Sequence, residues 1–500
     1  MRIFSNLHVI QDKNNYARLF DAILSQEKYD EQELKKQLKG GTLESQFAVA
    51  KNNLHKLILR SLRFYNSGKT ANSNLIESIE IIEILYNKGL FAQAKKEIDK
   101  AKKEAALYDK VILPMELFKW EKKIFMMLSP GSIPKDAGAK LHLGEMTAFN
   151  KVSVAFQYNK LLSQFLSLTS QSTQMNKNQM DGMLEHFMED PLLLLEPARE
   201  EFYAYLFYHR IHSDFYRLTK NFPKSIYHLD KILNNFVSKS QIIAEEPIIY
   251  LDLLTSKYHL AIDSNDLKKA EEVNKNIERF LKDKISRTKG KKTERLFAVY
   301  RYYVKTDLLM TRGEYEKGLT LAKEIKEVFP PGNFETNHIF LLPIWYNMAL
   351  FHVASGIYSD ALDWLQPFIQ SGKNIRRHDL FTFARILQMI IHYHLSEEIV
   401  TEHLIRKHQN NVSQNGKVLK LEDSIVRCLN KLLHAPTKEK KKKILERKAL
   451  KFAMMYSMPE QQKSFHLFNA CQWIEAELKE VPMKNIKPSQ PFPMEQREYA

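Results

Sequence analysis

Apolar residues recur at intervals of three and four along most of this 500-residue chain, a pattern that predicts amphipathic α-helices. The clearest stretch is 345–368, which predicts two short helices joined at Gly356. Ala349 and Ala361 are small and fall where the two helices would approach closely. Large residues such as Trp345 and Leu365 fall where space between the helices must be filled. We therefore expect an antiparallel helical hairpin here.

The same spacing recurs along the chain. It begins with an anchor residue. An aromatic or apolar residue follows two positions after the anchor, a small residue five positions after it, and apolar residues nine and twelve positions after it. The spacing also begins at Gly89 and Gly313, and in degenerate form at Lys220 and Asn265. The anchors at 220, 265, 313 and 356 lie 45, 48 and 43 residues apart. This recurrence predicts stacked hairpins, in which each repeat packs on its neighbours.

At these offsets, residues 345–368 resemble a tetratricopeptide repeat, carried by Gly356, Tyr358, Ala361, Leu365 and Phe368. Repeats of that family usually have a period of about 34 residues, so the helices or loops here must be longer. The resemblance implies an all-α fold, a right-handed α-solenoid (superhelix) of antiparallel helical hairpins. It also implies a class of activity, the binding of a protein or peptide partner. A non-repetitive all-helical protein with chance matches is the alternative.

Four regions are expected. Residues 1–70 form an N-terminal helical region, and 71–380 form the repeats that resemble the family. Residues 381–480 continue with C-terminal helical repeats and end in a capping helix at 465–478, because an array needs a cover for its last apolar face. Residues 481–500 hold four prolines without helical spacing and are expected to be a disordered tail. The resemblance itself covers only about 74–108 and 207–368.

Composition and cysteine usage favour a reducing, cytoplasmic location. The chain has only two cysteines, Cys428 and Cys471, and neither lies in a metal-binding or disulfide pattern. The N-terminus lacks the apolar core of a signal peptide, and no apolar run reaches the ~20 residues that span a bilayer. We expect no membrane insertion.

The chain carries a formal net charge of +16. Such an excess of lysine and arginine allows nucleic acid as a partner, so a helical-repeat nucleic-acid-binding or regulatory protein is the alternative function. The most basic segment, 282–292, is expected to be a loop between repeats. A generally basic, solvated surface explains the same charge, because the lysines are spread along helices.

No motif for catalysis or for a cofactor is present: the chain lacks a P-loop, a dinucleotide-binding glycine pattern, HExxH and GxSxG. His209 and His212 stand three residues apart with Asp214 nearby, which could hold a metal. The repeat register instead places both histidines at packing positions. We expect a non-catalytic protein without cofactor or metal.

The resemblance also implies where a partner would bind. In the family, the first helix of each pair lines a concave groove, and certain side chains point into it. Carried over from the matched anchors, these positions are Arg210, Asp214, His259, Tyr303, Asp307 and Tyr346. Their mixed chemistry suits a peptide or a helix better than a polyanion, because the two aspartates would repel phosphate. The alternative is that these side chains are buried as ordinary packing.

Overall fold

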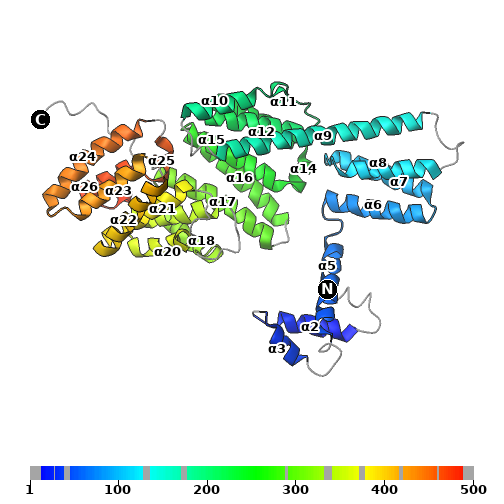
Figure 1. The fold of residues 1–500 in the computed structure, drawn as a ribbon, viewed down its shortest axis with the longest axis horizontal. Helices are drawn as coiled ribbons and strands as arrows, with labels where there is room; N and C mark the ends of the chain where they lie inside the picture. The colour runs from blue at the N-terminus through cyan, green and yellow to red at the C-terminus, as the bar shows by residue number, and fades with distance from the viewer. Residues whose placement is uncertain are drawn as a thin grey trace. The chain divides into compact units, whose positions relative to one another are not determined.

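The structure is a computed structural model that describes residues 13–27, 29–38, 46–127, 136–170, 177–287, 291–331, 340–370, 378–415, 420–458 and 461–487 (Figure 1). Every regular element in those ranges is helical. The predicted all-α class is therefore confirmed, as is its construction from successive antiparallel helices. The right-handed superhelical twist stays a prediction.

The five predicted anchors all occupy the same kind of turn. Each has a positive φ, between 60° and 77°, and the next helix begins two residues later. The hairpins are α6 (Ala71–Asn87) with α7 (Phe91–Leu107), α12 (Phe202–Leu218) with α13 (Phe222–Ser238), α15 (Pro247–Asp263) with α16 (Leu267–Arg287), α17 (Lys291–Arg312) with α18 (Tyr315–Val328), and α19 (Leu341–Ala354) with α20 (Tyr358–Gln370).

The backbone explains why these anchors end a helix. At Gly356 the N–H donates to Val353 O at 3.0 Å, and the next N–H, of Ile357, donates to His352 O at 2.9 Å. This pair of bonds satisfies carbonyls that the helix end would leave unpaired, and it requires a left-handed residue. Glycine adopts that conformation without steric cost. Lys220 and Asn265 adopt it at φ 60°, so the missing glycines do not change the turn.

A sixth turn of this kind escaped the sequence pattern. Ser396 has φ 59° and joins α21 (His378–His394) to α22 (Glu398–Asn415). Thr401, Ile405 and His408 stand five, nine and twelve residues after it and are all buried. The pattern missed this hairpin because Glu398 replaces the aromatic residue and His408 replaces the last apolar one. Local packing tolerates both exchanges, since the backbone turn sets the geometry.

The small residue five positions after each anchor lies at the contact between helices. Ala94, Ala270 and Ala361 are completely buried. Gly318 occupies the same position in α18 and is buried as well. Large side chains could not fit there, which is why the pattern demands small ones.

One compact unit comprises residues 1–169, 183–212 and 230–247. Within it, α2 (Lys13–Leu24), α3 (Glu31–Gln37) and α5 (Phe47–Asn66) share a small core around Leu19, Leu34 and Leu54. A separate core joins α6, α7 and α8 (Leu113–Met127). The unit also holds α9 (Ala137–Ser170), α11 (Pro191–Leu194) and α14 (Ser240–Glu245), and α10 (Lys177–Met188) contributes its second half.

The second unit comprises residues 170–182, 213–229 and 248–500. Successive helices pack on one another from α16 through α22, and α23 (Lys420–Leu433) packs on α24 (Lys438–Tyr456). Two short helices follow, α25 (Gln462–Leu467) and α26 (Ala470–Lys479). These units do not test the predicted boundaries at 70 and 380, which stay predictions.

Three expectations about the second unit need correction. The closing helix expected at 465–478 is broken, because the Asn469 side chain caps α26 by accepting from Gln472 N at 3.0 Å. Residues 282–287 of the expected basic loop continue α16, and α17 begins at Lys291. The first seven residues of the expected disordered tail are folded: Met483 and Ile486 are buried around a 3₁₀ turn. Residues 288–290 and 488–500 lie outside the described chain.

Candidate partner-binding site

The structure places the six predicted groove residues on four helices. Arg210 and Asp214 lie on α12, and His259 lies on α15; all three are half-buried. Tyr303 and Asp307 lie on α17, and Tyr346 lies on α19. Three of the six meet in one cluster within the second unit: His259, Tyr303 and Asp307.

Hydrogen bonds hold this cluster together. The Tyr303 hydroxyl lies 2.9 Å from His259 Nε2, and the Tyr258 hydroxyl donates to Asp307 Oδ2 at 2.8 Å. His466 of α25 adds an ion pair, with Nε2 at 3.6 Å from Asp307 Oδ1. These contacts link α15, α17 and the C-terminal α25.

Burial and charge set the protonation states of the cluster. Burial lowers the pKa of His259 to about 4, so this ring is neutral near pH 7 and its Nε2 can accept a hydrogen bond from the Tyr303 hydroxyl. Burial acts to raise the pKa of Asp307, but the His466 hydrogen bond and charge outweigh it and the net shift is downward. Burial likewise acts to lower the pKa of His466, yet Asp307 raises it overall. The pair therefore favours the carboxylate form of Asp307 and the protonated form of His466.

The predicted contact residue Tyr303 is packed rather than exposed. Its ring stacks on Phe340 with centroids 4.3 Å apart and planes at 8°, and 7% of the residue is exposed. The cluster satisfies its own polar atoms with neighbouring side chains. Within this unit the hydrogen bonds and the ion pair of the cluster therefore hold α15, α17 and α25 together.

Tyr346 is a correction to the expected groove. It is 1% exposed, and its hydroxyl donates to Leu467 O at 3.1 Å. The carbonyl belongs to α25, an element that the repeat resemblance alone does not predict. A partner could reach Tyr346 only after α25 had moved away.

His209 and His212 occupy packing positions on α12, as the repeat register predicted. Both are buried, and His212 Nδ1 lies 3.0 Å from Tyr208 O, its partner in the preceding turn. The His209 ring lies edge-on against Tyr205 with centroids 4.2 Å apart. Within the described ranges, no three His, Cys, Asp or Glu side chains are grouped to hold a metal ion.

The ion pair of His466 predicts a pH-dependent contribution to stability. The folded pKa of His466 lies above its ordinary 6.5, so the pair stabilises fully below about pH 6.5 and loses its effect as pH rises through the folded value. His466→Gln should therefore reduce the free energy of unfolding more at pH 6 than at pH 8. The side chain is 43% exposed, so we expect a difference below about 1 kcal/mol.

Urea unfolding of both proteins at the two pH values measures this difference. An equal loss at pH 6 and pH 8 would show that the pair does not form.

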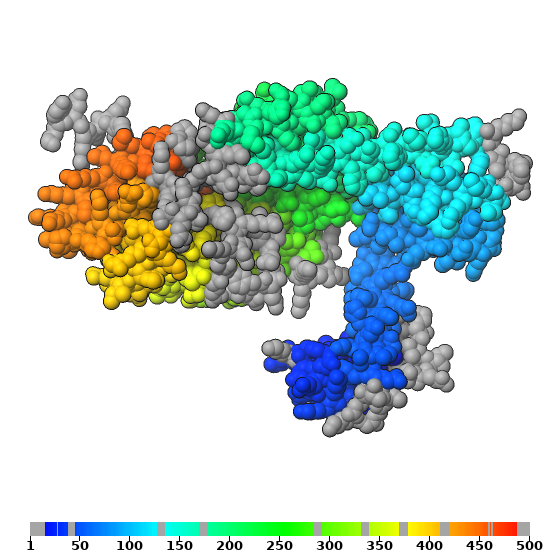
Figure 2. Space-filling view, viewed as in Figure 1, coloured from blue at the N-terminus to red at the C-terminus, as the bar shows by residue number. Residues whose placement is uncertain are grey.

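A more open apolar surface lies in the first unit. On α9, Met146, Phe149 and Phe156 project from one face and are 43%, 53% and 56% exposed. Ile112, just before α8, is 59% exposed. These four side chains are called the α9 face below. Figure 2 shows α9, in cyan, at the surface of the molecule.

A pocket of about 290 Å³ adjoins the α9 face. Its lining is mostly apolar and comes from the segment before α8, from α9 and from α12; the residues include Val111, Leu113, Ala155, Phe156, Tyr203 and Phe207. Its polar lining residues include Asn72 and Lys110. The sequence pattern does not reveal this surface because helical spacing identifies only the positions that are buried in packing.

Comparisons with known proteins add no relative to this picture. A scan against models of known protein families finds no match, and a search of curated proteins finds no significant match. Among the described helices, none combines membrane-spanning length with a sufficiently apolar composition. The likeness to tetratricopeptide repeats stays a prediction based on the spacing of the hairpins.

Proposed function

We propose that this protein is a non-catalytic scaffold of tetratricopeptide-like hairpins that binds a helical segment of a protein partner. The α9 face carries the proposal. Exposed apolar side chains that gather beside a pocket are typical of protein-interaction sites. Isolated exposed apolar residues need no such explanation, but here two of the four large ones, Ile112 and Phe156, line one pocket, and the other two lie on the same helix as Phe156.

The shape of the surface favours a helix as the occupant. Met146, Phe149 and Phe156 lie at intervals of three and seven along α9, which corresponds to ~15 Å of helix. An amphipathic partner helix presents apolar residues at matching intervals and buries them in such a groove.

Charge favours an acidic partner helix. Lys160 is exposed on α9, one turn after Phe156 and on the same side of the helix, and Glu145 of the same helix is already paired with Lys122 of α8 at 2.5 Å. An acidic residue on the flank of a partner helix would complement Lys160 and speed its association. The groove predicted from His259, Tyr303 and Tyr346 is a weaker candidate because its aromatic rings are packed.

Affinity capture with matched variants tests the proposal. The double variant Phe149→Ser/Phe156→Ser should lose the bound protein, because truncating two exposed aromatic anchors removes hot-spot contacts. Both side chains are exposed, so the fold should change by no more than about 0.5 kcal/mol.

The control is Leu450→Ser/Met454→Ser on α24, where the side chains are 72% and 56% exposed. This control should capture the partner at wild-type strength. Equal capture by both double variants would contradict the proposal. A second copy of this chain as the only captured protein would identify the α9 face as a self-association surface instead.

The exposed start of α24 supports a second candidate, nucleic-acid binding. Lys438, Lys440, Lys442 and Lys443 are exposed there. Lysines in such a row contact phosphates and release counterions, so binding would weaken steeply with salt. If the captured material disappears after nuclease treatment and is also lost in the double variant Lys442→Gln/Lys443→Gln, nucleic-acid binding would be favoured over binding of a partner helix.

A further inference from the structure

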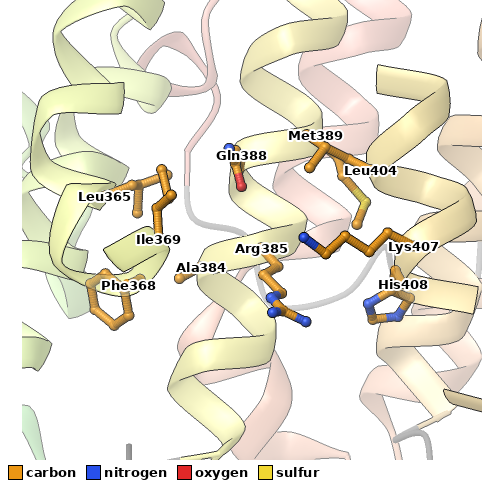
Figure 3. A pocket seen from close by; sticks show the side chains of 10 residues that line it. All are labelled: Leu365, Phe368, Ile369, Ala384, Arg385, Gln388, Met389, Leu404, Lys407 and His408. Carbon is orange, nitrogen blue, oxygen red and sulfur yellow. The ribbon is translucent and has the colours of Figure 1, made fainter. Parts of the chain in front are cut away.

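A small pocket opens between α20, α21 and α22 in the second unit (Figure 3). It encloses about 120 Å³, several times the ~30 Å³ that one water molecule occupies. Leu365, Phe368 and Ile369 of α20 form an apolar wall. The opposite side is basic, and none of the residues that line the pocket is acidic.

Three nitrogen-bearing side chains converge on this space. Arg385 extends from α21, and Lys407 and His408 extend from α22; Figure 3 shows all three directed into the gap between the two helices. Like charges held this close are unfavourable without a counter-charge. The pocket therefore concentrates positive charge that a bound anion would neutralise.

Arg385 has no ion pair with any carboxylate in the described chain. Its guanidinium instead lies over the Phe381 ring, 4.4 Å from the centroid. The residue is half-buried, and this loss of water lowers the pKa of Arg385. An arginine so placed keeps its planar set of N–H donors available for an oxyanion, which it can bind through two parallel bonds.

His408 supplies an independent observation. It is 6% exposed, and its Nε2 is shut off from solvent without a hydrogen-bond partner among the described residues. A buried polar atom left unpaired costs free energy. Since His408 lines the pocket, a ligand atom placed there would satisfy it.

We propose that this pocket binds the phosphate group of a phosphate monoester. Arg385 and Lys407 supply two positive charges, and His408 supplies a third when it is protonated. A dianionic phosphate balances these charges, whereas a carboxylate carries only one. The apolar wall of Leu365, Phe368 and Ile369 would contact the organic part of the ester. The ester is either a small metabolite or a phosphorylated side chain of a protein; both present the same chemistry.

Calorimetric titration with three probes tests the proposal: inorganic phosphate, phenyl phosphate and a phosphoserine peptide. Phenyl phosphate should bind more tightly than inorganic phosphate, because its ring adds contact with the apolar wall. Arg385→Gln and Lys407→Gln should each weaken phenyl phosphate binding by about tenfold or more, the loss expected for a charge-assisted hydrogen bond.

Arg406→Gln is the matched control. Arg406 precedes Lys407 on α22, is 71% exposed and pairs with Glu402 at 2.6 Å. Its removal lowers the net charge equally and should leave phenyl phosphate binding within about twofold. Equal weakening by Arg406→Gln, or no saturable binding of any probe to the wild-type protein, would overturn the proposal. A phosphoserine peptide that binds best would identify a phosphorylated protein as the source.

Sulfate provides a pH test, because its charge does not change between pH 6 and pH 8. Burial and the charge of Arg385 lower the pKa of His408, and the charge of Asp423 on α23 opposes this shift. Lys407 is a second positively charged residue in the lining of the same pocket. A bound anion favours the protonated ring, so binding takes up a proton and sulfate should bind more tightly at pH 6 than at pH 8. His408→Gln should remove this pH dependence while the Arg406→Gln control keeps it. Sulfate affinity in the wild-type protein that does not change with pH would contradict the role of His408.

Discussion

Replacing Gly318 with alanine should destabilise the protein by about 1–3 kcal/mol, the usual cost of overpacking a core. A Cβ atom at this position would lie 2.3–2.4 Å from three atoms of the Phe351 ring. Phe351 is completely buried in α19 and cannot turn away. Alanine normally favours a helix over glycine by about 1 kcal/mol, so steric overlap must reverse the usual sign.

Gly182→Ala is the matched control. Gly182 also lies inside a helix, α10, but no atom lies within 4 Å of the position that its Cβ would take. This variant should be neutral or more stable by up to about 1 kcal/mol. Urea unfolding measures both changes. A Gly318→Ala protein as stable as the wild type would show that α18 and α19 are farther apart than described.

A double-mutant cycle makes the contact specific. Phe351→Leu alone should cost stability because it leaves a cavity. Combined with Gly318→Ala it should cost less than the two single changes together, since the smaller side chain relieves the overlap. If the free-energy changes of the two single variants simply add in the double variant, the destabilisation by Gly318→Ala does not come from overlap with Phe351.

Replacing Gln472 with leucine should cost about 2–4 kcal/mol and release the C-terminal segment. The Gln472 side chain is buried and makes three hydrogen bonds. Its Oε1 accepts from the Tyr315 hydroxyl at 2.7 Å, and its Nε2 donates to Met483 O at 3.0 Å and to Ile486 O at 2.8 Å. Leucine fills a similar volume but leaves the Tyr315 hydroxyl and Ile486 O without their partner, each at a cost of about 1 kcal/mol or more, whereas Met483 O still accepts from Ile486 N at 3.0 Å.

Tyr315→Phe separates the parts of this network. It breaks only the bond between α18 and Gln472 and should cost about 1 kcal/mol, with residues 481–487 still protected. Hydrogen exchange of those amides distinguishes the two variants: Gln472→Leu should raise their exchange strongly, and Tyr315→Phe should not. Unchanged protection in Gln472→Leu would show that the segment is held by other contacts.

The repeated hairpins were predictable because their cause is local. A left-handed turn residue, followed at fixed offsets by a small and then two apolar residues, sets helix boundaries within a few residues. Gly89, Gly313 and Gly356 therefore mark turns correctly, and even Lys220 and Asn265 do so without glycine. Ser396 shows the limit of this reasoning, because its turn is made by the backbone while the side chains that follow depart from the pattern.

The candidate site was less predictable because it depends on contacts that are distant in sequence. His466 reaches Asp307 across 159 positions of the chain, and Leu467 covers Tyr346 in the same way. Nothing in the local pattern of α25 indicates these contacts. Likewise Gln472 lies on a short amphipathic helix, and nothing in the sequence indicates that it binds residues 483 and 486.

The proposed binding surfaces were not predictable from the sequence for a different reason. Helical periodicity identifies which side chains a helix buries, but not which apolar side chains remain exposed after packing. Phe149 and Phe156 have the spacing of core residues, and only the structure shows that no described element covers them. The basic pocket was missed because Arg385 and Lys407 belong to different helices and each resembles an ordinary solvated residue.

Photocrosslinking from the α9 face tests the proposed scaffold function most directly. A photoreactive phenylalanine analogue placed at Phe156 should form an adduct with a protein in native extract, and mass spectrometry should map it to an acidic amphipathic helix. The same analogue at Leu450, which is 72% exposed on α24, should not form that adduct. An identical set of adducts from both positions, or adducts with nucleic acid alone, would contradict the account.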